Sequence, residues 1–175
     1  MLAPAVCWTD MPSESRMPRS RILFTVPADA GRISDVLGEA GATVDDREGM
    51  DHDEIAAHLA SVPGETVEAI VEDDDPLTPI HDVAGLLDGT GCAYFGVVDA
   101  FQERSRGMRV LGRLLLDPDG SGNRIEKPIP WEHGEPDLDA RTLEAAGMER
   151  AEAKRVDEVF RARLDARPRT ATPRP

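Results

Sequence analysis

The feature that most constrains the fold is the order in which short apolar runs follow one another along the 175-residue chain. Runs with apolar residues at every position, or at every second position, alternate with segments in which apolar residues recur at helical spacing. The predicted order is strand, helix, strand, helix, strand, helix, strand, strand and helix. No internal repeat is visible, so the length fits one domain with a helical extension.

The expected elements end at residues that break regular structure. In chain order they are strand 22–26, a helix after Asp29, strand 42–46, a helix after Asp51, strand 66–71, a helix from Thr78, strands 92–101 and 108–116, and a charged helix over 137–166. Glycine or proline follows the first strand and each of the first three helices. Asp51 and Glu54 form a capping-box pattern. Glycine and proline dominate residues 117–136, which predicts a long surface loop.

Two architectures fit this order. Strict alternation of strands and helices favours a parallel sheet with helices on both faces, an α/β three-layer sandwich. The strands alternate in polarity, however, and residues 92–116 have the pattern of an antiparallel hairpin. An α+β fold with helices mostly on one face is therefore preferred. It would be a ferredoxin-like βαββαβ core with the helix after Asp51 inserted, an added β-hairpin strand and a C-terminal helix.

Composition divides the chain into four segments. Residues 21–136 are expected to form the α+β domain, and residues 137–166 a charged C-terminal helix. Residues 1–20 and 167–175 are expected to be disordered. No run approaches the roughly 20 apolar residues of a membrane span, and the two cysteines do not indicate a disulfide framework. A cytoplasmic protein is predicted.

The negative charge is concentrated in one block. Residues 21–103 carry nineteen acidic and three basic side chains, whereas the rest of the chain carries fifteen acidic and seventeen basic ones, so the net charge of −14 lies entirely in this block. Such a field repels phosphate backbones and acidic membranes and attracts cationic surfaces. Aromatic residues make up 4% of the chain, too few to stack on bases. Neither direct nucleic-acid binding nor membrane binding is expected.

The densest acidic point directly follows a predicted strand and consists of Glu72, Asp73, Asp74 and Asp75. Four carboxylates in a turn are a candidate interaction surface for a cationic partner, although such runs also serve solubility alone. Their natural counterpart is an arginine group at positions 104, 106, 109 and 113. The expected partners are a basic protein surface or a second copy of the chain in a homodimer.

The first loop combines an acidic residue with glycine between a strand and a helix. The chain passes from Val26 through Asp29 and Gly31 into the helix, and through Gly41 into the second strand. Over residues 22–46 this arrangement resembles the opening of an ACT regulatory domain. The resemblance implies a βαββαβ fold that pairs with a second copy and binds an amino acid or similar effector, with Asp29 and Gly31 as ligand-binding residues. Alternatively, Asp29 caps the helix and Gly31 permits a tight entry.

A second loop begins like a calcium-binding loop. Asp117, Asp119 and Ser121 place oxygen donors at the first, third and fifth positions before a glycine, which suits a hard cation. The later positions do not continue the pattern, because Pro128 occupies the place of the bidentate glutamate. A turn built from aspartate, proline, glycine and serine is the simpler interpretation.

The four histidines have no spacing typical of zinc. His58 is expected to pair with Glu54 on its own helix. His81 and Asp82 lie in the first turn of a predicted helix and are a candidate base with its carboxylate, but no nucleophile motif accompanies them. No cofactor is expected.

Three functions follow from these observations. The favoured one is a non-enzymatic interaction or inhibitor protein that docks on a basic surface through its acidic block. The alternatives are an ACT-like domain that senses a small ligand and a small enzyme that uses His81 and Asp82.

Overall fold

The computed structural model describes residues 19–75, 77–100, 111–130 and 138–165. The elements are β1 (Arg19–Thr25), α1 (Gly31–Glu39), β2 (Thr43–Val44), α2 (His52–Ser61), β3 (Thr66–Glu72), α3 (Leu77–Leu87), β4 (Tyr94–Ala100), β5 (Leu111–Asp117), β6 (Ile125–Pro130), α4 (Ala140–Ala145) and α5 (Arg150–Asp165). The disorder expected for residues 1–20 is wrong for Arg19 and Ser20, which begin β1 because they pair with Glu72 and Val71 of β3. The rest of that segment, residues 167–175 and the arginines at 104, 106 and 109 lie outside the described residues.

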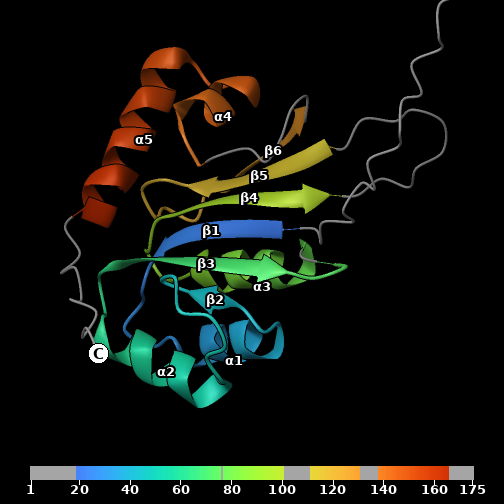
Figure 1. The fold of residues 1–175 in the computed structure, drawn as a ribbon. Coiled ribbons are helices and arrows are strands. Elements are labelled where there is room, and N and C mark those ends of the chain that lie inside the picture. The colour runs from blue at the N-terminus through green and yellow to red at the C-terminus, as the bar shows by residue number, and fades with distance from the viewer. Residues whose placement is uncertain (1–18, 76, 101–110, 131–137, 166–175) are drawn as a thin grey trace, which may run out of the picture.

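The six strands form one sheet in the order β2-β3-β1-β4-β5-β6, and each neighbouring pair is antiparallel. The fold is therefore a mixed α+β fold, and the parallel sheet of the alternative architecture is not formed. The predicted hairpin of β4 and β5 is confirmed, with Tyr94 opposite Asp117 and Ala100 opposite Leu111. Figure 1 shows the sheet between two groups of helices.

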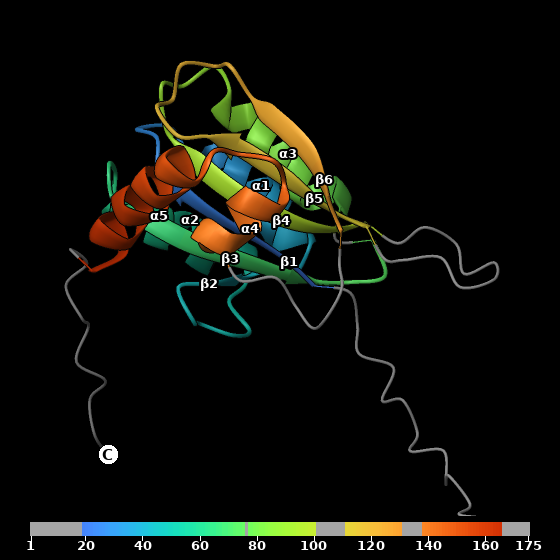
Figure 2. The ribbon, with the colours of Figure 1, turned by 90° about the horizontal axis from the view of Figure 1, so that it is seen from above.

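One face of the sheet packs against α1, α2 and α3 (Figures 1 and 2). Alternate strand residues point into this core, among them Ile22, Phe24, Val67, Ala69, Val71, Tyr94, Val98 and Leu115. The helices contribute the apolar stripes that the sequence predicts, including Ile33, Leu37, Ile55, Leu59, Ile80, Val83 and Leu87. This core is therefore specified by apolar residues at helical spacing in the helices and at every second position in the strands.

The opposite face of the sheet carries a second core, formed with α4 and α5. The strands contribute Leu23, Phe95, Val97, Leu114, Leu116 and Ile129. Phe160 of α5 lies with its ring centroid 5.6 Å from that of Phe95, at a tilt of 53°. The prediction that the helices lie mostly on one face missed this layer. β1, β4 and β5 bury both of their faces, which is why their apolar residues are contiguous.

Two expectations for the last third of the chain are wrong. The surface loop predicted for 117–136 contains β6, which pairs with β5 from Leu116 opposite Ile125 to Leu111 opposite Pro130. β6 lies at the edge of the sheet, where the missing amide hydrogens of proline are tolerated. The single helix predicted for 137–166 is divided into α4 and α5 at Gly147, whose φ is 91°.

Candidate functional site

The turn after β2 is a short hairpin turn that changes the direction of the chain. Arg47 donates its amide to the carbonyl of Val44 at 3.0 Å, and the two residues between them have φ angles of 51° (Asp45) and 59° (Asp46). Positive φ at both central positions is typical of a type I′ turn, and aspartate tolerates this region better than most residues. The turn places Asp46 on the surface.

Asp45 fixes this turn to two other elements. One carboxylate oxygen accepts a hydrogen bond from the amide of Glu68 in β3 at 3.0 Å, and the other lies 2.9 Å from Nε2 of His58 in α2. The predicted pair of Glu54 and His58 is therefore wrong. Glu54 instead completes the capping box of α2, which is confirmed by its bond to the amide of Asp51 at 2.9 Å. Because both Asp45 oxygens are occupied, the turn is held against the edge of the sheet.

A recess of about 380 Å³ lies beside this turn at the edge of β3. Its lining consists of Arg19, Thr43, Asp46, Glu48, Ile70 and Glu72. Three carboxylates and one guanidinium therefore face the same space, and Arg19 Nε lies 3.6 Å from Glu72 Oε1. Residues far apart in the sequence meet here because β2 pairs with β3 and β3 pairs with β1.

The edge of β3 is only partly covered beside this recess. β2 has two residues, which pair with Ala69 and Ile70. Within the described residues, Val71 and Glu72 have no strand partner on this side, although β1 covers their other side. An uncovered edge presents backbone donors and acceptors to an added strand.

The acidic run after β3 combines surface exposure with a local structural role. All four residues, Glu72, Asp73, Asp74 and Asp75, are exposed. Asp75 accepts hydrogen bonds from the amide of Thr78 at 3.4 Å and from its hydroxyl at 2.8 Å, at the start of α3. Asp73 accepts one from the amide of Asp75 at 3.2 Å. Glu72 is the member of this run that lines the recess.

Asp29 is an exposed residue of the loop between β1 and α1, and Gly31 is the exposed first residue of α1. Asp29 accepts a hydrogen bond from the amide of Gly31 at 3.2 Å. The residue at the N-cap position is Ala30, without a capping side chain, so the interpretation of Asp29 as the helix cap is wrong. Gly41, with a φ of 62°, follows the end of α1 as expected.

The calcium-like sequence forms the tight turn between β5 and β6. Asp117 is fully buried, and its two oxygens accept hydrogen bonds from the amides of Ser121 (3.1 Å) and Gly122 (2.8 Å). Asp119 also accepts a bond from the Ser121 amide, at 3.2 Å. Among the described residues, no group of three histidine, cysteine, aspartate or glutamate side chains is arranged to hold a metal ion. The carboxylates of this loop serve as acceptors that shape the turn.

His81 belongs to a polar network that joins α3 to the second half of the sheet. Its Nε2 lies 3.4 Å from Glu126 Oε1, which also accepts a bond from Arg113, and its Nδ1 lies 3.3 Å from the guanidinium of Arg124. Asp82, the carboxylate that the sequence suggested, is exposed. Partial burial raises the pKa of Glu126, but hydrogen bonds from Arg113 and His81 lower it by more. The pKa of Glu126 therefore lies below its usual value.

Arg124 connects this network to the core. It donates to the carboxylate of Asp88 at 2.7 Å and to the hydroxyl of Tyr94 at 3.0 Å, while Tyr94 donates to Asp88. Burial, followed by the bond to Asp88, raises the pKa of Tyr94, so its hydroxyl stays protonated. These side chains bond to one another, and the network links β6 to α3 and β4. Sequence spacing gave no signal for it, because its members come from four different segments.

Neither sequence nor structure comparison connects this chain to a known family. It matches no protein-family model, and no curated protein or solved structure shows significant similarity to it. Within the described residues, no helix has both the length and the apolar content needed to cross a bilayer.

Proposed function

We propose that this chain is a non-enzymatic interaction protein that binds a basic, extended segment of another protein at the open edge of β3. The recess at this edge carries the proposal, since it brings Asp46, Glu48 and Glu72 together beside strand residues that have no partner on that side within the described part of the chain. The sequence places the same carboxylates within the acidic block.

An extended segment satisfies both properties of this edge. Its backbone can pair with β3 beyond Ile70, as in other proteins that bind peptides by adding a strand. Its alternate side chains then project to one face of the sheet, where arginine or lysine can meet the carboxylates of the recess. Arg19 offsets one of the three negative charges, so the recess retains an excess of acid for a cationic partner.

The charge of the whole block supports the same partner. Residues 21–103 carry nineteen acidic and three basic side chains, so a cationic segment is attracted before it makes contact. At physiological ionic strength such attraction extends over roughly 8 Å. Binding should therefore weaken as salt is added.

The test uses a fluorescent peptide of alternating arginine and valine and the full chain, with affinity measured by anisotropy at rising salt. The triple variant Asp46→Asn, Glu48→Gln, Glu72→Gln is expected to bind about tenfold more weakly, because each exposed ion pair contributes up to about 1 kcal/mol. The matched control removes three charges elsewhere, through Asp29→Asn, Asp53→Asn and Glu65→Gln. It is expected to change the affinity by less than about threefold, through the long-range field alone.

Three outcomes would overturn the proposal. The first is peptide affinity that does not depend on salt, and the second is an equal loss in the triple variant and its control. The third is a salt-sensitive homodimer in sedimentation experiments that the triple variant abolishes, because a second copy of the chain would then be the occupant of this edge.

The strand order favours one further candidate, a ferredoxin-like core with an ACT-like role in sensing a small ligand. The strands β2-β3-β1-β4 are antiparallel, with α1 between β1 and β2 and α3 between β3 and β4. This is the order expected of a βαββαβ core to which α2, β5 and β6 have been added. A thermal-shift screen with amino acids tests this role. Stabilisation that is lost in Asp29→Ala would support it, and a screen without any stabilising ligand would contradict it.

A further inference from the structure

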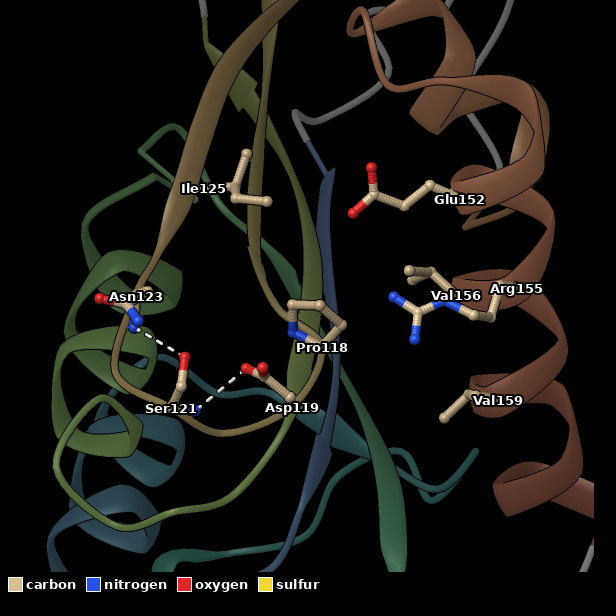
Figure 3. Close-up of a pocket in the computed structure, with 9 residues that line it drawn as sticks. All are labelled: Pro118, Asp119, Ser121, Asn123, Ile125, Glu152, Arg155, Val156 and Val159. Atoms are coloured by element: carbon tan, nitrogen blue, oxygen red, sulfur yellow. Dashed lines mark hydrogen bonds between the residues drawn. The ribbon is translucent and has the colours of Figure 1, made fainter.

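A second cavity lies between the β5–β6 turn and α5 (Figure 3). Its volume is about 340 Å³, at the lower end of the about 300 to 1,000 Å³ typical of small-molecule sites. It borders the second core and is separate from both the β3 edge and the loop of Asp29 and Gly31.

The turn forms a fixed wall of this cavity. The buried carboxylate of Asp117 holds the amides of Ser121 and Gly122. Gly120 has a φ of 69°, and a Cβ atom there would lie 2.2 Å from the carbonyl oxygen of Gly91, so the turn packs directly on the neighbouring loop. The wall presents the side chains of Asp119, Ser121 and Asn123 to the cavity. Because Asp117 occupies the two amides, they are not available to an anion.

The helix forms the other wall and supplies the opposite charge. Along α5, the cations Arg150, Lys154, Arg161 and Arg163 each have a polar partner. Arg155, which faces the cavity, has none among the described residues, and neither does Glu152 one turn earlier. An arginine without a partner among the described residues can donate to the carboxylate of a ligand.

The floor between these charges is aliphatic. Ile125 of β6 and Val156 and Val159 of α5 line it. Val159 is 38% exposed, and it is the one large apolar side chain at the surface in the described part of the chain. An apolar side chain left open beside a cavity gains stability when a hydrocarbon group covers it.

We propose that this cavity binds a small aliphatic zwitterion, a molecule with one carboxylate, one ammonium group and a hydrocarbon part. Arg155 binds the carboxylate, Asp119 and Glu152 bind the ammonium group, and Ile125 and Val159 cover the hydrocarbon. An aspartate is ionised at neutral pH, and hydrogen bonds from the side chain and the amide of Ser121 lower the pKa of Asp119 further. Phosphates and dicarboxylates are disfavoured, because they carry no cation and the cavity holds two carboxylates and only one guanidinium.

The test follows backbone amide NMR signals of the full chain on addition of L-leucine or 5-aminopentanoate. We expect saturable shifts at Ser121, Asn123 and Arg155 at ligand concentrations of about 1 to 10 mM. The two probes distinguish whether the charges must share one carbon atom or lie at opposite ends of the hydrocarbon. 4-Methylpentanoate and 3-methylbutylamine each retain one charge. Each should bind at least about tenfold more weakly than the zwitterions.

Arg155→Ala should weaken binding of the zwitterion about tenfold, because it removes a charge-assisted hydrogen bond. The control is Lys154→Ala on the same helix, which removes a cation paired with Glu158 and should leave the affinity unchanged. Arg155 is exposed, so its variant is expected to keep the amide spectrum of the folded protein. Absence of shifts with both zwitterions, equal binding of the single-charge analogues, or equal effects of the two variants would overturn the proposal. The β3-edge triple variant should retain this binding, which separates the two sites.

Discussion

The packing of α5 on the sheet allows the loss of stability in a variant of the second core to be predicted, and the same packing forms one wall of the cavity. Phe160 is 1% exposed, packs against Phe95 and lies 5.6 Å from the guanidinium of Arg163. Phe160→Ala removes the largest fully buried side chain of this helix. It would leave a cavity between α5 and β4 that neighbouring side chains cannot fill without moving the helix.

The expected loss in the free energy of unfolding is about 4 kcal/mol. Replacing a buried phenylalanine by alanine costs about 3–5 kcal/mol, and the contact with Phe95 accounts for about 0.5–1.5 kcal/mol of that. Domains are stable by about 5–15 kcal/mol, so much of the stability would be lost. For a chain of this size the melting temperature should fall by about 8–16 °C.

The assay is urea unfolding followed by circular dichroism. The matched control is Val159→Ala on the adjacent position, which is 38% exposed and should cost about 0.5 kcal/mol. Phe160→Leu, which retains an apolar group in the space, should fall between the two. If Phe160→Ala costs no more than Val159→Ala, the packing of α5 on this face, and with it the wall of the cavity, is wrong.

Two further predictions concern the turn and the surface of the first core. Gly120→Ala should destabilise the protein by about 2 kcal/mol or more in urea unfolding, because residue 120 has a left-handed backbone and its Cβ atom would clash with Gly91. The control Gly89→Ala places its Cβ atom in open space and should be nearly neutral. An equal loss of stability in the two variants would contradict the packing of this turn. A hydrogen bond to Asp35 raises the pKa of His52 above 6.5. The contribution of this pair to stability is then complete below pH 6.5 and is lost as the pH rises through the raised pKa. An NMR titration should show the pKa above 6.5 and its decrease in Asp35→Asn, whereas a pKa below 6.5 would contradict the pairing.

Local signals in the sequence were sufficient for the first core. The capping box of Asp51 and Glu54 and the glycine after α1 are interactions within a few residues, so the residues themselves specify them. Strand 66–71 is likewise predicted from a period of two, and Val67, Ala69 and Val71 of β3 share its buried face. These features set most of the element order in advance.

Patterns dominated by glycine and proline misled the prediction for the last third of the chain. β6 contains Pro128 and Pro130, which weaken its strand signal, and it forms because β5 offers a free edge. The partner of His81 was likewise misjudged, because Glu126 lies forty-five positions away and reaches it only when β6 joins the sheet.

For the candidate sites, the sequence determined charge and the tertiary structure determined position. The acidic block, the carboxylates after β3 and the glycine-rich turn can all be read from residue order, because charge and backbone freedom are properties of single residues. Antiparallel pairing alone brought Asp46, Glu48 and Glu72 around one recess, and the second core alone set Arg155 opposite Asp119. Such groupings depend on contacts between segments far apart in the chain, and these contacts form only after the entropy of closing the intervening chain has been lost.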